Sequence, residues 1–280
     1  MAGCVPILMY HEITTEPTST GRLAVRPDTF AQQLGYLKAA GYSTLTAGQF
    51  ASALNFEGGL NSAGRSLPAK PVVLTFDDGF ADFYDTALPL LERHGLTGTL
   101  FVTSGWTGGS GEYLSRHRPP GMLSGEQIRE IAGAGIEIGA HSVTHPELDQ
   151  LSAGSLRQEL VGGKQALEDL LGAPVPGLAY PFGYSSKAVR TSAAAVGYEY
   201  ACVVGNRLAS TGADRFALPR LTIGRSTRPH IFARVVAAER LPAEFAGLRM
   251  LTAGRSAVRL ARSALSRSAA ARLAQPRAAG

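Results

Sequence analysis

Four side chains that can bind a metal or move a proton follow strand-like segments of this 280-residue chain. Asp77 and Asp78 come directly after one apolar segment, and His141 and His145 come directly after another. In parallel barrels and open α/β sheets, active sites collect at the C-terminal ends of the strands. We therefore expect these four side chains to meet at one end of a sheet.

His141 and His145 have the spacing of a metal-binding pair. One helical turn would place both imidazoles on the same side, although Pro146 limits how far a helix can run. Two histidines and one carboxylate leave open positions on a bound ion, which suits Zn²⁺ or another divalent ion such as Co²⁺, Ni²⁺ or Mn²⁺. Packed or solvated histidines are the alternative interpretation.

The two adjacent aspartates suggest separate roles. Neighbouring residues on a regular strand point to opposite faces, so Asp77 and Asp78 share a cavity only if the strand ends there, which Gly79 permits. The alternative is a turn aspartate or one that caps a helix predicted over residues 80–91, and one of the pair could also do this beside a role in the site. An acid that does not bind the metal is free to accept a proton from an activated water. The set predicts metal-assisted hydrolysis of an amide or ester.

These residues also carry a family resemblance. Thr75–Gly79 (Thr-Phe-Asp-Asp-Gly) and His141–His145 (His-Ser-Val-Thr-His) resemble the first two motifs of the polysaccharide deacetylase family, in order and in spacing. Ala179–Gly183 is similar to the third motif, and Pro6–His11 resembles the branch that deacetylates poly-N-acetylglucosamine. The resemblance covers residues 5–225. It implies a distorted (β/α) barrel of seven or eight units and a glycan substrate that bears N-acetyl groups.

The resemblance implies roles for individual residues. Asp77 would be the general base. The implied metal ligands are Asp78, His141 and His145. The backbone N–H of Phe182 would help to hold the oxyanion, with Tyr180 beside it as a further substrate contact. A fixed amide donor suits this task because it needs no reorganisation during the reaction. Ser142 is expected to form a hydrogen bond within the metal loop, with a plain turn serine as the alternative.

Two features of the family are missing from the chain. Ala179 stands where many members have an arginine paired with the catalytic aspartate, and no late Leu-x-x-His motif supplies a general acid. Arg220 is the predicted partner of Asp77, with a surface ion pair as the alternative. His11 follows the first predicted strand and is the predicted acid or a substrate contact. Its alternative is a histidine that forms a hydrogen bond at a strand end.

Strand-like and helix-like segments alternate along the chain. Strands are predicted over residues 5–10, 72–76, 98–103, 136–140, 177–181, 198–204 and 216–223. Helical spacing of apolar residues occurs between several of them, in one case behind a capping box at Ser124–Gln127. This alternation predicts a parallel sheet or barrel with helices outside. Loops are expected at 55–69 and 107–120, the second as a lid, a substrate-binding insertion or a solvated excursion.

Positive charge is concentrated at the C-terminus. The chain has 27 basic and 22 acidic residues, but residues 241–280 hold seven arginines and one acid. We therefore predict a catalytic domain over residues 1–240 and a basic tail over residues 241–280. The nearly neutral body excludes a nucleic-acid-binding surface. The tail would contact an anionic membrane surface weakly if it forms an amphipathic helix, and is otherwise a frayed terminus.

The remaining features concern location and function class. No apolar run approaches the ~20 residues of a membrane-spanning helix, and the N-terminus lacks the pattern of a secretory signal. A cytoplasmic location is therefore expected. The leading functional hypothesis is metal-dependent removal of N-acetyl groups from an amino-sugar polymer or related glycan. The alternatives are hydrolysis of another small amide or ester, and a catalytically inactive carbohydrate-binding relative.

Overall fold

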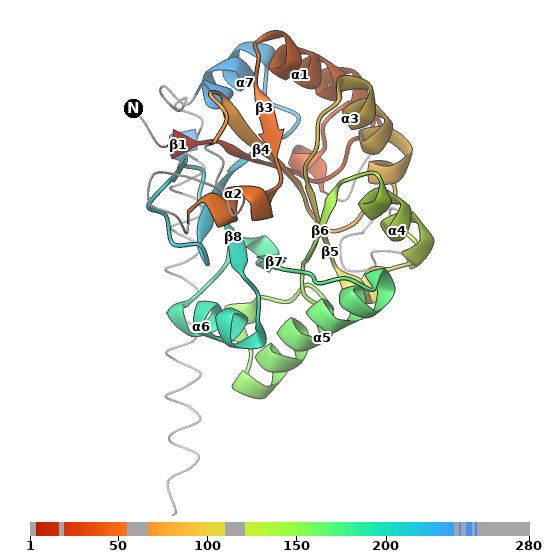
Figure 1. The fold of residues 1–280 in the computed structure, drawn as a ribbon, viewed down its shortest axis with the longest axis vertical. Helices are drawn as coiled ribbons and strands as arrows, with labels where there is room; N and C mark the ends of the chain where they lie inside the picture. The colour runs from red at the N-terminus through yellow and green to blue at the C-terminus, as the bar shows by residue number, and fades with distance from the viewer. Residues whose placement is uncertain are drawn as a thin grey trace, which may run out of the picture.

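Parallel strands close into a barrel in the computed structural model, which describes residues 4–16, 20–54, 67–109, 121–237, 241, 245–247 and 250 (Figure 1). Around the barrel the strands are β2 (Ile7–Tyr10), β10 (Leu218–Thr222), β8 (Tyr200–Val204), β7 (Gly177–Ala179), β6 (Glu137–Ala140), β5 (Thr99–Val102) and β4 (Pro71–Phe76). Parallel pairing of β2 with β4 closes the ring. The predicted (β/α) barrel is confirmed, with seven strands in the closed ring.

Three short strands lie outside this ring. β3 (Ser43–Leu45) pairs with the first half of β4, on the same edge where β5 pairs with its second half. β1 (Cys4–Val5) and β9 (Ala209–Ser210) form a small antiparallel sheet. The sequence pattern missed β3 and β9 because strands this short show little periodicity. It also joined β1 to β2, which Pro6 separates because proline has no N–H for a ladder.

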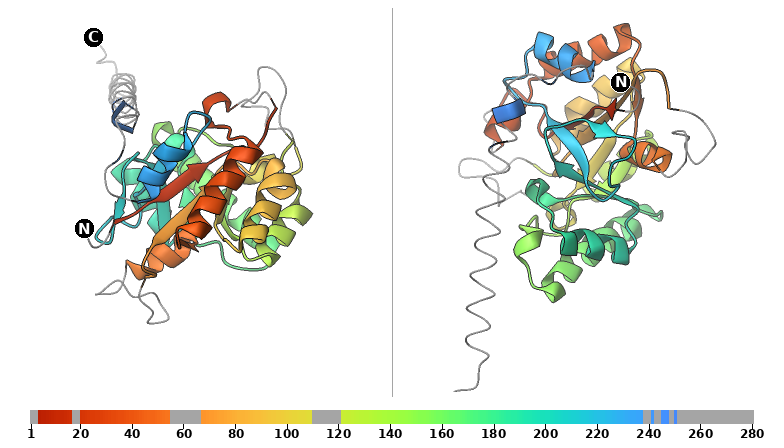
Figure 2. Two further views of the ribbon diagram at one scale, coloured as in Figure 1. Left: turned by 90° about the horizontal axis from the view of Figure 1, so that it is seen from above. Right: turned by 90° about the vertical axis from the view of Figure 1, so that its left-hand side faces the viewer.

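The helices surround the barrel in two groups. They are α1 (Pro27–Ala39), α2 (Ala47–Ala53), α3 (Leu88–His94), α4 (Gly125–Gly133), α5 (Ala153–Leu171), α6 (Lys187–Val196) and α7 (Pro229–Val236). Helix α1 contacts both α3 and α7, while α5 contacts both α4 and α6 (Figures 1 and 2). The capping box predicted at the start of α4 is confirmed.

The helix predicted over residues 80–91 begins later than expected. A π-helical turn spans Phe83–Ala87, and regular α-helix starts at Leu88. Pro89 lies in the first turn of α3, directly after the π-helical turn, and its missing N–H cannot donate to a carbonyl of that turn. Neither Asp77 nor Asp78 caps this helix, so the capping alternative is wrong, whereas Asp78 does lie in a turn.

The N-terminal end of the barrel is closed by helix α2. Phe50 of α2 belongs to one buried apolar cluster with Val73 and Phe101 of the barrel strands. Burying these side chains removes apolar surface from water, which is the main favourable contribution to folding. Because α2 covers the N-terminal end, we expect the active site at the C-terminal end of the barrel.

One carboxylate ties this closed end together. Glu137, the first residue of β6, accepts hydrogen bonds from the Tyr200 hydroxyl (2.9 Å), the Thr99 hydroxyl (2.8 Å) and the Gly48 amide (2.9 Å). The amide belongs to the first turn of α2, where a negative charge is favourable. Glu137 therefore links α2 to strands β5, β6 and β8.

Some predictions fall on residues that the structure does not describe. These are most of the two loops, at 55–66 and 110–120, and most of the basic tail, including residues 251–280. Within the described residues, no helix combines the length and the apolar character that crossing a bilayer requires.

Candidate active site

Three potential metal ligands meet at the C-terminal end of the barrel. Asp78, His141 and His145 each offer one ligand atom, and these atoms all lie within 4.8 Å of one another. Asp78 Oδ1 is 3.5 Å from His141 Nε2 and 3.4 Å from His145 Nε2. All three side chains are buried. The predicted convergence of these residues is confirmed.

The backbone at Asp78 explains how two adjacent aspartates reach the same site. Strand β4 ends at Phe76, and Asp78 (φ 76°) and Gly79 (φ 88°) both adopt left-handed conformations. The predicted break after the strand is confirmed, but it begins at Asp78 itself. A residue with a side chain is uncommon in this region and is found there mainly where the surrounding structure enforces it.

The two histidines converge by a different route from the predicted one. Residues 141–147 form a loop and not a helical turn, with Ser142 (φ 64°) and His145 (φ 59°) in left-handed conformations. Two such residues fold the chain back sharply enough to bring the imidazoles together, and Pro146 is compatible with this loop. The predicted hydrogen bond of Ser142 is confirmed, because its Oγ accepts from the His145 amide at 3.0 Å.

Hydrogen bonding fixes the orientation of His141. Its Nδ1 lies 2.7 Å from the Ala179 carbonyl oxygen, so Nδ1 carries the proton and Nε2 presents a lone pair. Burial lowers the pKa of His141, and burial together with the charge of His141 lowers the pKa of His145 to about 2. Both imidazoles are therefore neutral near pH 7.

The three converging atoms fit a divalent cation. Within the described structure, buried Asp78 Oδ1 has no hydrogen-bond donor, yet it faces the Nε2 atoms of two neutral imidazoles. Burial raises the pKa of Asp78 well above its usual value, and the charges of Asp77 and Glu12 add to this. A buried carboxylate oxygen without a donor is costly, and a cation held between Asp78 and the two imidazoles would satisfy it. Two imidazoles and one carboxylate suit Zn²⁺ and its first-row neighbours.

Asp77 and Arg220 form a buried ion pair beside these ligands. Arg220 Nη1 and Nη2 donate to the two carboxylate oxygens of Asp77 at 2.6 and 2.7 Å, and Arg220 is fully buried. The predicted pairing is confirmed, and the surface alternative is wrong. Burial favours protonation of Asp77, but the charge and hydrogen bonds of Arg220 outweigh it and hold the pKa at about 2. Asp77 is therefore a fixed carboxylate at neutral pH.

His11 lies in the same electrostatic cluster. Burial lowers its pKa to about 4, with opposing contributions from Asp77, which raises it, and from Arg220 and His141, which lower it. Its Nδ1 is buried and has no hydrogen-bond partner among the described residues. The alternative of a histidine held by hydrogen bonding at a strand end therefore finds no support at this nitrogen.

The turn after β7 separates the two residues predicted there. Phe182 has a left-handed backbone (φ 58°), and its ring lies 4.6 Å from that of His145, at the edge of the site. Tyr180 is fully buried in the core, and its hydroxyl donates to the Phe216 carbonyl at 3.1 Å. This placement does not support a substrate contact by the Tyr180 side chain, because its polar end is already occupied away from solvent.

Two aromatic residues of the site were missed from the sequence. The Trp106 ring lies 5.3 Å from that of His145, and Tyr184 stacks on Phe182 with 5.7 Å between ring centroids. Trp106 lies four residues beyond the end of β5, so a search of the segment after each strand would have found it. Together with Phe182, these residues form an aromatic wall beside the ligand cluster.

Comparisons with known proteins agree with this site. Residues 64–201 match the family model described as polysaccharide deacetylase. The protein YxkH of Bacillus subtilis (strain 168), which carries a provisional polysaccharide deacetylase name, is 28% identical over 219 residues, covering 78% of this chain and 71% of that protein. The poly-beta-1,6-N-acetyl-D-glucosamine N-deacetylase of Escherichia coli (strain K12) is 24% identical over 159 residues, covering 53% of this chain and only 22% of that enzyme.

A solved structure extends the similarity to the whole barrel. The Streptococcus pyogenes deacetylase PplD, solved in complex with acetate, matches with a TM-score of 0.72 and 29% identity, covering 83% of this chain and 98% of that chain. The ligand cluster and Asp77 lie inside the region that matches the family model, while His11 and Arg220 lie outside it. Motifs, barrel and ligand geometry agree, and the chain therefore carries a domain of the polysaccharide deacetylase family.

Proposed function

We propose that this protein is a metal-dependent hydrolase that removes N-acetyl groups from an amino-sugar polymer or a related glycan. The observation that carries the proposal is the cluster of Asp78, His141 and His145 directly beside a carboxylate, Asp77, that is kept ionised by Arg220. The names of the relatives support the same reaction class and an N-acetylated glycan substrate.

The ligand cluster and its neighbour have different tasks. Asp78, His141 and His145 would hold the ion, with Zn²⁺ as the proposed metal and Co²⁺, Ni²⁺ or Mn²⁺ as alternatives. The ion would supply Lewis acidity for attack of water on the acetamide carbonyl. Asp77 accepts the proton of that water, and Arg220 holds both of its oxygens in a fixed orientation. The Phe182 amide is the proposed donor to the developing oxyanion.

The proton must then reach the leaving amine, and His11 is the proposed donor. Because its pKa is about 4, His11 is neutral at pH 7 and must first receive a proton. Asp77, whose pKa is about 2, holds a proton less strongly than His11 does. In this proposal the proton passes from Asp77 to His11 and on to the amine. If His11 only contacts substrate, Asp77 returns the proton itself.

The aromatic wall is the proposed contact for the sugar. Trp106, Phe182 and Tyr184 present ring surfaces beside His145, and such surfaces pack well against the apolar face of a pyranose ring. Phe182 is 36% exposed, so its ring is accessible from solvent. Tyr180 is left as a core residue in this proposal.

Release of acetate tests the proposed function. We would incubate the purified protein with N-acetylglucosamine oligomers and Zn²⁺ or Co²⁺, and measure free acetate with and without a chelator. Metal-dependent acetate release is the expected result. If metal binds but no N-acetylated glycan yields acetate, the proposal fails and a carbohydrate-binding role is favoured.

Three further proposals concern organisation and location. We propose a boundary between a catalytic domain (1–240) and a basic tail (241–280). We also propose a weak contact of that tail with anionic membranes, and a cytoplasmic location. All three proposals rest on sequence patterns. Binding of the full chain and of a chain ending at residue 240 to anionic vesicles, together with cell fractionation, would test them.

A further inference from the structure

We infer that Glu159 of helix α5 is a positioning residue for the metal site, because it holds the loop that carries His145 in its ligand geometry. This inference rests on the metal site of the proposed function. Glu159 Oε2 accepts hydrogen bonds from the amides of Val143 (2.8 Å) and Thr144 (3.0 Å), and its Oε1 accepts from the Thr144 hydroxyl (2.6 Å). These are two of the three residues between His141 and the second ligand histidine.

The loop needs such a partner because its backbone has no regular secondary structure. The amide of His145 donates to Ser142 Oγ. The carbonyl oxygens of Ser142 and Val143 accept from the amides of Ser104 (3.2 Å) and Gly105 (2.9 Å). Val143 is half-buried and Thr144 is exposed, and Glu159 accepts a hydrogen bond from the amide of each. Among these hydrogen-bond partners of the loop, Glu159 carries a charge. Charge-assisted hydrogen bonds are stronger than neutral ones.

Helix α5 is built to receive the loop. Residues 159, 162 and 163 share one face of the helix, because their spacing is i, i+3 and i+4. A Cβ on Gly163 would lie 3.0 Å from the carbonyl carbon of Ser142, and one on Gly162 would lie 3.0 Å from a methyl group of Val143. The glycines therefore permit close approach of the loop, and the carboxylate one turn earlier fastens it.

The positions of the residues with left-handed backbone show why the hydrogen bonds of Glu159 affect the loop geometry. Ser142 and His145 both adopt positive φ angles, which residues with side chains disfavour. Val143 and Thr144 lie between them. Without Glu159 these two residues would lose the contacts that hold the strained bend closed, and the imidazole of His145 would move away from Asp78.

Metal affinity tests this inference in the full-length protein. Apo-protein is titrated with Zn²⁺ in competition with a chromogenic chelator, below the unfolding temperature of each variant. Glu159→Ala should weaken Zn²⁺ binding by about 10–100-fold, the range for groups that orient a metal ligand. The visible absorption of the Co²⁺-loaded variant should also change, because it reports ligand geometry and not fold stability. Unchanged affinity and spectrum would overturn the inference.

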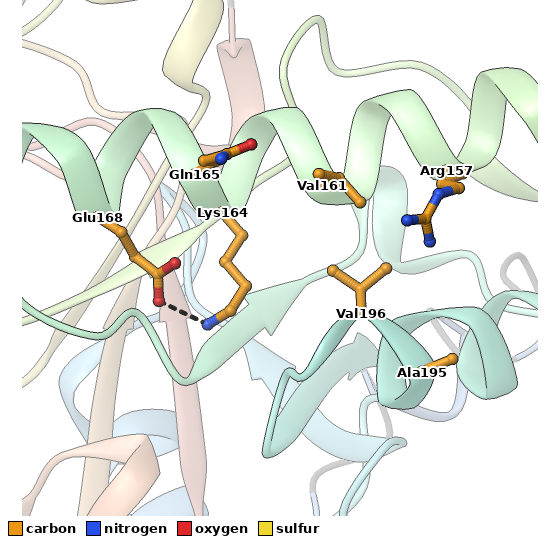
Figure 3. A pocket seen from close by; sticks show the side chains of 7 residues that line it. All are labelled: Arg157, Val161, Lys164, Gln165, Glu168, Ala195 and Val196. Atoms are coloured by element: carbon orange, nitrogen blue, oxygen red, sulfur yellow. Dashed lines mark hydrogen bonds and ion pairs between the residues drawn. The ribbon is translucent and has the colours of Figure 1, made fainter.

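A second glutamate of the same helix is a matched control. Glu168 also accepts a backbone amide hydrogen bond, from Val175 (3.0 Å), and pairs with Lys164 (2.8 Å), in a shallow pocket between α5 and α6 (Figure 3). Glu168→Ala should therefore perturb α5 to a similar degree and leave Zn²⁺ affinity unchanged. Equal loss of affinity in both alanine variants would mean that helix stability, and not positioning of the loop, is responsible.

The Glu159→Gln variant distinguishes the effect of hydrogen-bond geometry from the effect of the negative charge. In Glu159→Gln the carbonyl oxygen can accept from both amides, and the NH₂ group can donate to Thr144 Oγ1. We expect this variant to recover most of the Zn²⁺ affinity, and a loss as large as that of the alanine variant would overturn positioning by hydrogen bonds. If Glu159→Ala does not fold, Thr144→Val removes one contact alone and should shift affinity in the same direction. Wild-type protein that bound no Zn²⁺ would overturn the metal site, and this inference with it.

Discussion

Each end of the barrel holds one carboxylate at the end of a barrel strand, and the two carboxylates differ in whether their oxygens accept hydrogen bonds. At the N-terminal end, Glu137 accepts hydrogen bonds from two hydroxyls and one amide. At the C-terminal end, Asp78 Oδ1 has no donor among the described residues and faces two imidazole nitrogens. The first arrangement stabilises the fold by itself. The second fits a bound cation, which marks the C-terminal end as the candidate functional end.

The backbone shows the same contrast. Among the described residues, five that are not glycine have positive φ angles, and all five follow the C-terminal ends of barrel strands. They are Asp78, Ser142, His145, Phe182 and Asn206. Strain of this kind persists where function requires a particular geometry and the surrounding packing enforces it. The closed end has no comparable cluster within the described part of the chain.

Replacing Asp78 should give the largest effect on metal content and acetate release. Asp78→Asn should remove most of the bound metal and reduce acetate release to the level of the chelated wild type, because two remaining ligands seldom hold a divalent ion tightly. The melting temperature of the apo-protein should not fall, since the lost charge had no donor. Elemental analysis and thermal melting check both parts. Wild-type metal content would refute the ligand assignment.

Replacing the paired carboxylate should separate turnover from metal binding. Asp77→Asn should retain the metal and lose on the order of 10²–10⁴ in kcat, because the proton acceptor is removed. It also leaves Arg220 buried without its charge partner, which costs about 3–5 kcal/mol of stability, so rates must be measured on folded protein. Metal loss here, with retention in Asp78→Asn, would require the two roles to be exchanged.

The proton donor is the next test of the functional end. His11→Ala should keep the metal and lose about 10²–10⁴ in kcat on an N-acetyl sugar, because an amine leaving group needs a proton. An ester of the same sugar has a better leaving group and should be affected much less. Equal losses on amide and ester would indicate that His11 binds substrate. Full activity on the amide would leave Asp77 as the donor.

Arg220 should set the pH dependence of the reaction. The folded-state pKa of Asp77, about 2, lies below its usual value of 3.8, so Asp77 stays ionised until the pH falls towards 2. Arg220→Met should raise the pKa of Asp77 and move the acid limb of the kcat/KM profile to higher pH. Arg220→Lys keeps a positive charge and should move it less. An unchanged limb in the Met variant would show that another group controls it.

The same pair affects stability with a defined sign. Because the pKa of Asp77 is lower in the folded state, its contribution to stability is present above pH 3.8 and is lost as the pH falls towards 2. Acid unfolding of the wild type should therefore show a component in this window. Arg220→Met should lack it.

The closed end should give the smallest effect on turnover. Glu137→Gln replaces one acceptor oxygen with an NH₂ group, so a donor at this site loses its partner. We expect a loss of about 1–3 kcal/mol in the free energy of unfolding and no change in kcat or metal content. Urea unfolding and acetate release measure the two. A loss of kcat without a loss of stability would break the comparison between the two ends.

Much of the barrel could be predicted from the sequence because its signals are local. Apolar segments such as Val72–Phe76 are typical of strands buried on both faces, and Ser124 with Gln127 marked the start of a helix. The ligands were also predictable, since each comes after a strand end, where a parallel barrel places its active site. Short elements such as β3 and α2 were missed because a few residues carry too little periodicity.

The sequence by itself determined the chemistry: two histidines, two adjacent aspartates and their order along the chain specify a hydrolytic metal site. Only the tertiary structure decided the geometry. It placed Arg220 of the last barrel strand against Asp77 and Tyr180 in the core, bent the histidine loop through left-handed residues, and set Glu159 against that loop. Contacts of this kind join residues far apart in the chain, and their selection depends on packing, which no local pattern of residues records.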